Sequence, residues 1–236
     1  MLARLLPLLF GLGAGLVIWH FSAWRTLKAL SARSVPLADA RLLALCDRLA
    51  AALGVQSVPM RIYEEPAVNG LAAPDGQIFL TRGFYERYRS GAVTAEELTS
   101  VIAHELGHVA LGHARRRMID FSAQNAMRAV LVALLSRFVP GLGAWLADLI
   151  SGLLAARLSR QDEYEADAYA AALLTKAGLG TEPQRRLFAK LDALAGSGRG
   201  PAWLMSHPAP RERIAAIERL TAGWPPGPAP TVAEPD

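Results

Sequence analysis

The alternation of apolar and polar residues predicts a chain built mostly of helices. Residues 36–53 have leucines at helical spacing and are followed by Gly54, which is typical of an amphipathic helix that ends at a glycine. Residues 94–118 show the same pattern and open with a capping box of Thr94 and Glu97. The continuous apolar face of this second helix predicts that it is largely buried. That face consists of Leu98, Val101, Ile102, Leu106 and Val109.

A small β-sheet is predicted between these two helices. Residues 60–64 alternate in polarity as a strand does. Residues 68–73 and 77–81 flank a Pro-Asp-Gly turn and are expected to pair as a β-hairpin. The free edge of such a sheet could hold an extended peptide by main-chain hydrogen bonds, and a purely structural sheet accounts for the pattern equally well.

Two further segments are apolar over a longer range. Residues 5–21 contain no Asp, Glu, Lys or Arg, and their length is at the short end for a membrane-spanning helix. We expect an uncleaved membrane anchor over residues 1–24, because no convincing cleavage site follows; a cleaved signal peptide is the alternative. Residues 126–156 are interrupted by charges and by Pro140-Gly141. This pattern predicts a hairpin of two helices that packs in the core, forms a lid or lies at a membrane interface.

The composition favours contact with a membrane. Hydrophobic residues make up 52% of the 236 residues, and the mean hydropathy of +0.22 is high for a soluble protein of this size. The formal net charge is +4, and the basic residues are scattered without interleaved aromatic residues. This distribution argues against a nucleic-acid partner and favours a membrane surface. The single cysteine, Cys46, excludes an intramolecular disulfide and is predicted to lie in the core.

The candidate chemistry lies in the second helix, in the segment His104-Glu105-Leu106-Gly107-His108. Residues four apart share one face of a helix, so His104 and His108 can direct two imidazole nitrogens at one point, as two ligands of a zinc ion do. Glu105 lies one residue further round, where it can take a proton from a water that zinc has acidified. This is the H-E-x-x-H pattern of metalloproteases. His113 lies about 140° round the helix from His108 and is expected on the surface.

A third ligand has to come from another segment, because the metzincin pattern would need a histidine where this chain has Ala114. Ser159 and the acidic residues after it are predicted to open a further helix, with Ser159 as its N-cap. Glu163 and Asp167 lie four apart on that helix. Glu163 could therefore complete the metal site while Asp167 accepts the other ring N–H of a ligand histidine. Glu165 points the other way and is expected to be solvated; for the segment alone, an ordinary acidic helix start is the alternative.

These motifs together resemble the gluzincin family of HtpX, Oma-type and CAAX prenyl proteases. The resemblance extends over about residues 36–222. It rests on three segments: His104-Glu105-Leu106-Gly107-His108, Ser159-Arg160 with Glu163-Tyr164-Glu165-Ala166-Asp167, and Ser206-His207-Pro208 with Arg213-Ile214. The resemblance implies a membrane-associated zinc endopeptidase that binds a single zinc ion per chain through His104, His108 and Glu163.

The same resemblance implies roles for five other residues. Glu105 is the general base and then the general acid, and Asp167 orients a ligand histidine. His207 stabilises the oxyanion or caps the metal, and Arg213 supports that region. Asn69 falls on the strand that would line the substrate.

We therefore expect an α+β, mostly helical, zincin-like metallopeptidase domain over residues 34–222, with residues 126–156 as a helical hairpin insert. An N-terminal transmembrane helix would precede the domain, and residues 223–236 would form a disordered Pro-rich tail. The expected activity is hydrolysis of peptide bonds in unfolded or damaged proteins at a bacterial-type inner membrane. The expected partners are a protein or peptide substrate and membrane lipid. Two alternatives are a non-cleaving zinc-binding chaperone or adaptor, which would not need Glu105, and a secreted soluble peptidase.

Overall fold

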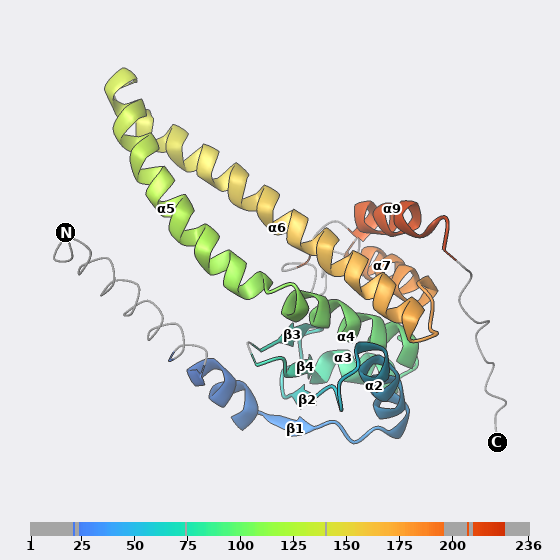
Figure 1. Ribbon diagram of the computed structural model, residues 1–236. Helices are drawn as coiled ribbons and strands as arrows, with labels where there is room; N and C mark the ends of the chain where they lie inside the picture. The colour runs from blue at the N-terminus through green and yellow to red at the C-terminus, as the bar shows by residue number, and fades with distance from the viewer. Residues whose placement is uncertain are drawn as a thin grey trace.

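The computed structural model describes residues 21, 24–73, 75–139, 141–195, 207 and 210–224, without the side chains of 118–123. Most of the predicted membrane anchor and of the C-terminal tail lies outside these residues. Within the described part, no helix combines the length and the apolar character that a membrane crossing requires. This part of the chain is a mostly helical domain with one small sheet and a long helical hairpin that projects from it (Figure 1).

Four short strands form a mixed sheet in the order β1-β2-β4-β3. β2 and β4 run parallel, whereas β3 pairs antiparallel with β4, so the predicted hairpin is confirmed. β1 pairs with β2 and was not predicted. In this order β3 is an edge strand of the described sheet. The bounds are β1 (Ser34–Pro36), β2 (Met60–Tyr63), β3 (Gly70–Ala72) and β4 (Ile78–Thr81).

One central helix, α4, joins the layers of the domain. It packs against the sheet on one side and against α6 and α7 on the other, and it also contacts α2 (Figure 1). The helices are α2 (Ala40–Leu53), α3 (Arg82–Arg89), α4 (Ala95–Ala110), α5 (His113–Phe138), α6 (Gly143–Lys176), α7 (Glu182–Ala195) and α9 (Pro210–Thr221).

The start and the burial of α4 agree with the sequence prediction. The Thr94 side chain accepts a hydrogen bond from the Glu97 backbone N–H at 3.2 Å, and the Glu97 carboxylate accepts one from the Thr94 N–H at 2.9 Å. Leu98 and Ile102 are fully buried in the core. The predicted helix that ends at Gly54 is also confirmed, although it begins at Ala40 behind an Asp39 cap.

The end of α4 differs from the prediction. The helix stops at Ala110 instead of continuing to residue 118, and α5 starts at His113 in a new direction. Gly112 between them has a φ of +65°, a left-handed conformation that glycine adopts at little cost and that ends an α-helix. The angular position of His113 relative to His108 therefore cannot be calculated from a continuous helix.

The predicted helix start at Ser159 is also wrong, because α6 runs unbroken from Gly143 to Lys176. The residues before Ser159 are mostly alanine and leucine, which have high helix propensity. They carry the helix through Ser159 despite its capping preference. As a result, Glu163 and the second arm of the helical hairpin belong to one element.

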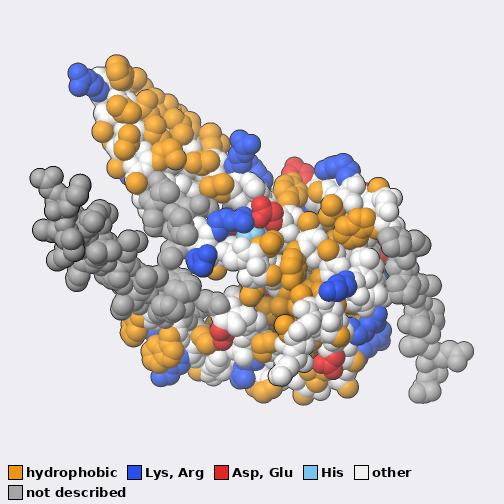
Figure 2. Space-filling model, in the orientation of Figure 1, with side chains coloured by type: hydrophobic (Ala, Val, Ile, Leu, Met, Phe, Trp, Pro, Cys, Tyr) orange, Lys and Arg blue, Asp and Glu red, His pale blue; other side chains and the backbone are white. Residues whose placement is uncertain are grey.

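The hairpin of α5 and α6 extends well beyond the domain, and apolar side chains cover most of its projecting part (Figures 1 and 2). Phe138 is 77% exposed, and Leu153 and Trp145 are exposed to a similar degree. Two helices joined near Gly141 were predicted, and the structure has them. Their outer half is not part of the core.

Candidate active site

Three side chains from α4 and α6 form a compact set of donor atoms. Nε2 of His104 lies 3.1 Å from Nε2 of His108 and 3.4 Å from Oε2 of Glu163. Nε2 of His108 lies 3.5 Å from Oε1 of Glu163. Two ligands about 2.0–2.1 Å from a tetrahedral zinc ion are about 3.3 Å apart. The two imidazoles and the carboxylate therefore fit the ligand set of one such ion, in both donor type and spacing.

Gly107 is the reason that α4 and α6 approach closely enough to form this set. A Cβ atom at position 107 would lie 3.0 Å from the carbonyl oxygen of Ala166 and 3.3 Å from Cβ of Tyr169. Gly107 is next to His108, and Ala166 is between Glu163 and Asp167 in sequence. The small residue thus brings the two ligand-bearing backbones together where the donor atoms converge.

The electrostatic environment gives two of these groups the ionisation states that a cation needs. Burial, together with the neighbouring His104, lowers the pKa of His108 to about 2, so its imidazole is neutral. Burial raises the pKa of Glu163, but hydrogen bonds with His104 and His207 outweigh this effect and hold the pKa well below its ordinary value. Burial also lowers the pKa of His104, yet hydrogen bonds to Asp167 and Glu163 raise it to about 9 overall. In a metal complex, the cation would take the place of the proton between His104 and Glu163.

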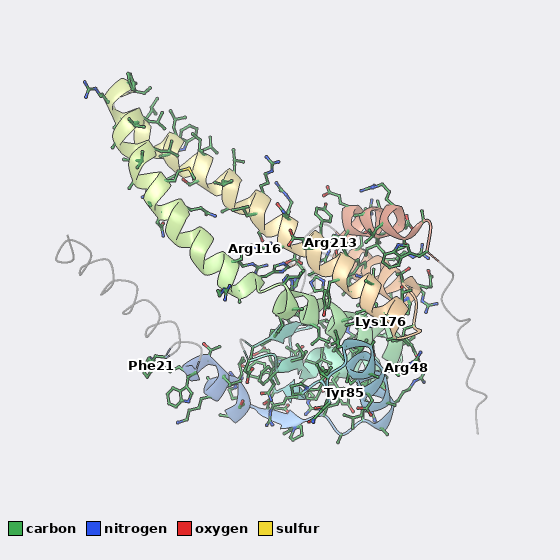
Figure 3. The ribbon with its side chains drawn as sticks, in the orientation of Figure 1. Phe21, Arg48, Tyr85, Arg116, Lys176 and Arg213 are labelled. Atoms are coloured by element: carbon green, nitrogen blue, oxygen red, sulfur yellow. The ribbon has the colours of Figure 1, made fainter. Side chains whose placement is uncertain are left out.

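Asp167 and Arg213 fix the ring of His104 from behind. Oδ1 of Asp167 lies 2.9 Å from Nδ1 of His104 and accepts its hydrogen bond, which leaves the lone pair of Nε2 facing the other ligands. Arg213, on α9, donates two hydrogen bonds of 2.6 Å to the Asp167 carboxylate. It is 1% exposed and stacks over the ring of Phe188. Figure 3 shows Arg213 between α9 and α6.

Glu105 and His207 stand on the open side of the donor set. Glu105 is buried, and its Oε1 atom has no hydrogen-bond partner among the described residues. Leaving a buried polar atom unpaired costs about 1–3 kcal/mol, so this oxygen is poised to bind a group that enters the site. Nε2 of His207 lies 3.6 Å from it. Nδ1 of His207 lies 2.5 Å from Glu163 and 3.3 Å from His104, so His207 could also act as a fourth donor.

A cleft of about 430 Å³ leads to these residues. It is lined by the edge strand β3 with Asn69 before it, and by Glu105, His108 and His207. The Asn69 side chain accepts a hydrogen bond from the backbone N–H of Gly70. The structure thus gathers the eight predicted site residues at one place: five are at the centre, Asp167 and Arg213 are behind His104, and Asn69 is at the cleft.

Sequence reasoning missed a second cluster beside His108. His113 was expected on the surface but is buried, and its Nδ1 lies 2.7 Å from Nδ1 of His108. Glu165 was expected to be solvated; it is half-buried, with hydrogen bonds to Arg116 and His113. The missed signal was Gly112, since a glycine one residue before His113 allows a helix to end there.

The chain is similar in sequence to known metalloproteases. The profile of peptidase family M48 matches residues 36–221. Metalloprotease LoiP of Escherichia coli (strain K12) is 32% identical over 184 residues, which are 77% of this chain and 70% of LoiP. Metalloprotease YcaL of the same organism is 32% identical over 181 residues, 75% of this chain and 69% of YcaL. A protease HtpX homolog of Gemmatimonas aurantiaca is 28% identical and covers 92% of this chain and 89% of its own length.

Proposed function

Because the chain belongs to peptidase family M48 and is a metalloendopeptidase, we propose that it cleaves peptide bonds with the residues around His104, His108 and Glu163. Its substrates are proteins or peptides. The observation that carries the assignment of residues is the convergence of two imidazoles and one carboxylate from separate helices at tetrahedral spacing, next to the unpaired Oε1 of Glu105.

His104, His108 and Glu163 would hold a single zinc ion in each chain. Bound there, zinc would polarise the scissile carbonyl and lower the pKa of water towards about 7. Asp167, held by Arg213, keeps the His104 ring in the orientation and tautomer that the site needs.

Glu105 is the proton carrier in this proposal. Its unpaired Oε1 takes a proton from the attacking water and then gives it to the leaving amine, so one carboxylate acts as base and then as acid. His207, 3.6 Å from Glu105, can donate a hydrogen bond to the oxyanion of the tetrahedral intermediate. Loss of one such donor typically lowers kcat about 10²–10³-fold.

The substrate would lie extended along β3. This strand is at the edge of the described sheet and lines the cleft that contains Glu105 and His108. Main-chain hydrogen bonds to an edge strand bind many sequences in the same way. Such binding suits unfolded or damaged proteins as substrates, and Asn69 would position the peptide at the start of the strand.

We also propose that the protein acts at a membrane, with residues 34–222 as its peptidase domain. Two features support this location: the uncharged apolar sequence at residues 5–21, and the exposed apolar side chains of the hairpin of α5 and α6. The residues that would cross the membrane lie outside the described part of the chain.

Substitution Glu105→Gln tests the proposed activity against a non-cleaving zinc-binding chaperone or adaptor. The variant should keep the zinc content of the wild type, measured by elemental analysis, and lose cleavage of an unfolded protein such as casein. Glu96→Gln is the matched control, because Glu96 is on the same helix and pairs at the surface with Arg41. Equal behaviour of wild type and Glu105→Gln would reject the catalytic assignment.

A further inference from the structure

His113 is buried beside the candidate metal ligands, although it is the first residue of α5. It is 1% exposed, and its ring meets the ring of His108 edge to face at 4.9 Å. Its Nδ1 lies 2.7 Å from Nδ1 of His108, and its Nε2 lies 3.3 Å from Oε2 of Glu165. Oδ1 of Asp162 is 3.9 Å from the same Nε2.

Only one arrangement of protons satisfies these contacts when His108 binds a metal. Nε2 of His108 faces the other ligands, so it must present a lone pair, and the ring proton is then on Nδ1. A separation of 2.7 Å between two nitrogens requires a hydrogen bond. Nδ1 of His113 is therefore the acceptor, and its own proton is on Nε2, which donates to Glu165.

We propose that His113, held by Glu165, is a positioning residue that orients His108 as a metal ligand through its Nδ1. This proposal rests on the ligand set of the proposed function. His113 does for His108 what Asp167 does for His104. The two imidazoles of α4 are then each fixed from behind, one by a carboxylate directly and the other by a carboxylate through a second imidazole.

The surroundings of Glu165 hold this chain of hydrogen bonds in place. Nη1 of Arg116 lies 2.7 Å from Glu165 and 3.2 Å from Asp162, and Nε of Arg117 lies 2.9 Å from Asp162. Arg116 is in the first turn of α5, on the side towards α6 (Figure 3). The two arginines thereby connect the start of α5, which carries His113, to α6.

A second metal ion in place of this hydrogen-bonded chain is the competing explanation. His113, Asp162 and Glu165 offer donor atoms within 4.8 Å of one another. However, guanidinium groups already pair with both carboxylates, and Nδ1 of His113 is used by His108. A cation would have to displace the arginines.

Two substitutions of His113 separate an acceptor role from simple packing. His113→Leu keeps the apolar bulk but removes the acceptor, whereas His113→Asn keeps an acceptor close to the position of Nδ1. Zinc affinity of the full-length protein is measured by competition with a chromophoric chelator. We expect about a 10–100-fold loss of affinity for His113→Leu, which is typical when a group that supports a ligand is removed. We expect His113→Asn to recover most of that loss.

Visible absorption of the cobalt-substituted protein reports the geometry of the metal site independently of the zinc affinity. The visible absorption of the cobalt-substituted protein should change in His113→Leu, because the orientation of His108 changes, and should return towards the wild-type spectrum in His113→Asn. Glu165→Ala provides a second route: Glu165 is half-buried, so this variant should fold, and it should bind zinc several-fold more weakly. The thermal midpoints of the metal-free proteins show whether each variant folds.

The possible outcomes decide between the alternatives. Wild-type affinity in both His113→Leu and Glu165→Ala would overturn the proposal, and so would equal losses in His113→Leu and His113→Asn. Two zinc ions in the wild type and one in His113→Leu would show a second metal site instead. A wild-type protein that binds no zinc would contradict the proposed function itself, and this result is distinct from all the others.

Discussion

Replacing Arg213 with methionine should strongly destabilise the protein, because it removes one partner of a fully buried ion pair. Arg213 is 1% exposed and donates two hydrogen bonds of 2.6 Å to Asp167, which is also buried. Methionine keeps much of the volume but leaves the Asp167 carboxylate without its principal cation. Breaking a buried pair in this way costs about 3–5 kcal/mol. For a domain of this size, that free energy corresponds to a decrease in Tm of about 6–20 °C.

The same helix provides the control. Arg211, two residues earlier in α9, also forms an ion pair with an aspartate, Asp192, but its side chain is 85% exposed. Solvent screens such a pair, so Arg211→Met should not change Tm beyond the error of the measurement. Thermal unfolding followed by circular dichroism on the metal-free proteins compares the two. If Arg213→Met unfolds at the same temperature as Arg211→Met, the argument that a buried pair fixes Asp167 is wrong.

The pH dependence gives a further check on the same pair. Burial raises the pKa of Asp167, but Arg213 and the hydrogen bond with His104 outweigh burial and hold the pKa below its ordinary value. The pair therefore stabilises the fold above the ordinary carboxyl pKa of about 3.9, and this contribution is lost as the pH falls through the lower pKa of the folded state. The difference in Tm between wild type and Arg213→Met should shrink as the pH is lowered below about 4.

Three other predictions follow from the described contacts. Gly107→Ala should push α4 away from the backbone of Ala166 and so weaken zinc binding, measured by competition with a chelator. Gly152→Ala is the control: a Cβ there meets no described atom within 4 Å, so the variant should keep the zinc affinity of the wild type and gain up to about 1 kcal/mol of stability. Equal zinc affinities of the two variants would refute the role of Gly107. Burial raises the pKa of Cys46 to about 12, so a thiol reagent at pH 8 should leave the native protein unmodified and label one thiol after denaturation. Removing the metal with a chelator should abolish casein cleavage and lower Tm, and added zinc should restore both. The effect on Tm follows because a ligand present at about 1,000 times its Kd stabilises the folded state by about 4 kcal/mol.

Local signals in the sequence were sufficient for the start of α4 and for the spacing of its two histidines, but not for the end of the helix. The capping box of Thr94 and Glu97 requires only neighbouring residues, and the four-residue spacing of His104 and His108 is fixed by the helix itself. The hairpin of β3 and β4 was also predictable, because a short turn joins its strands. The same spacing rule predicted that Glu163 and Asp167 lie on one face of a second helix.

Features that depend on long-range contacts could not be predicted in this way. The burial of His113 requires both the turn at Gly112 and the approach of α6, which brings Glu165 to it. β1 pairs with β2 across 24 or more residues, and no local pattern indicates that partner. Ser159 has the preference of a helix cap, but the helix formers before it prevail.

The unbroken course of α6 connects the tip of the hairpin to the candidate metal ligand Glu163. Glu163 is about 30 Å along this helix from Gly143, at the tip of the hairpin. A sideways displacement of about 3 Å at the tip would rotate a rigid helix of this length by about 6°. Because Glu163 is on the same unbroken helix, a rigid-body rotation of α6 that begins at its exposed apolar end would also change the angle at which Glu163 meets the two imidazoles.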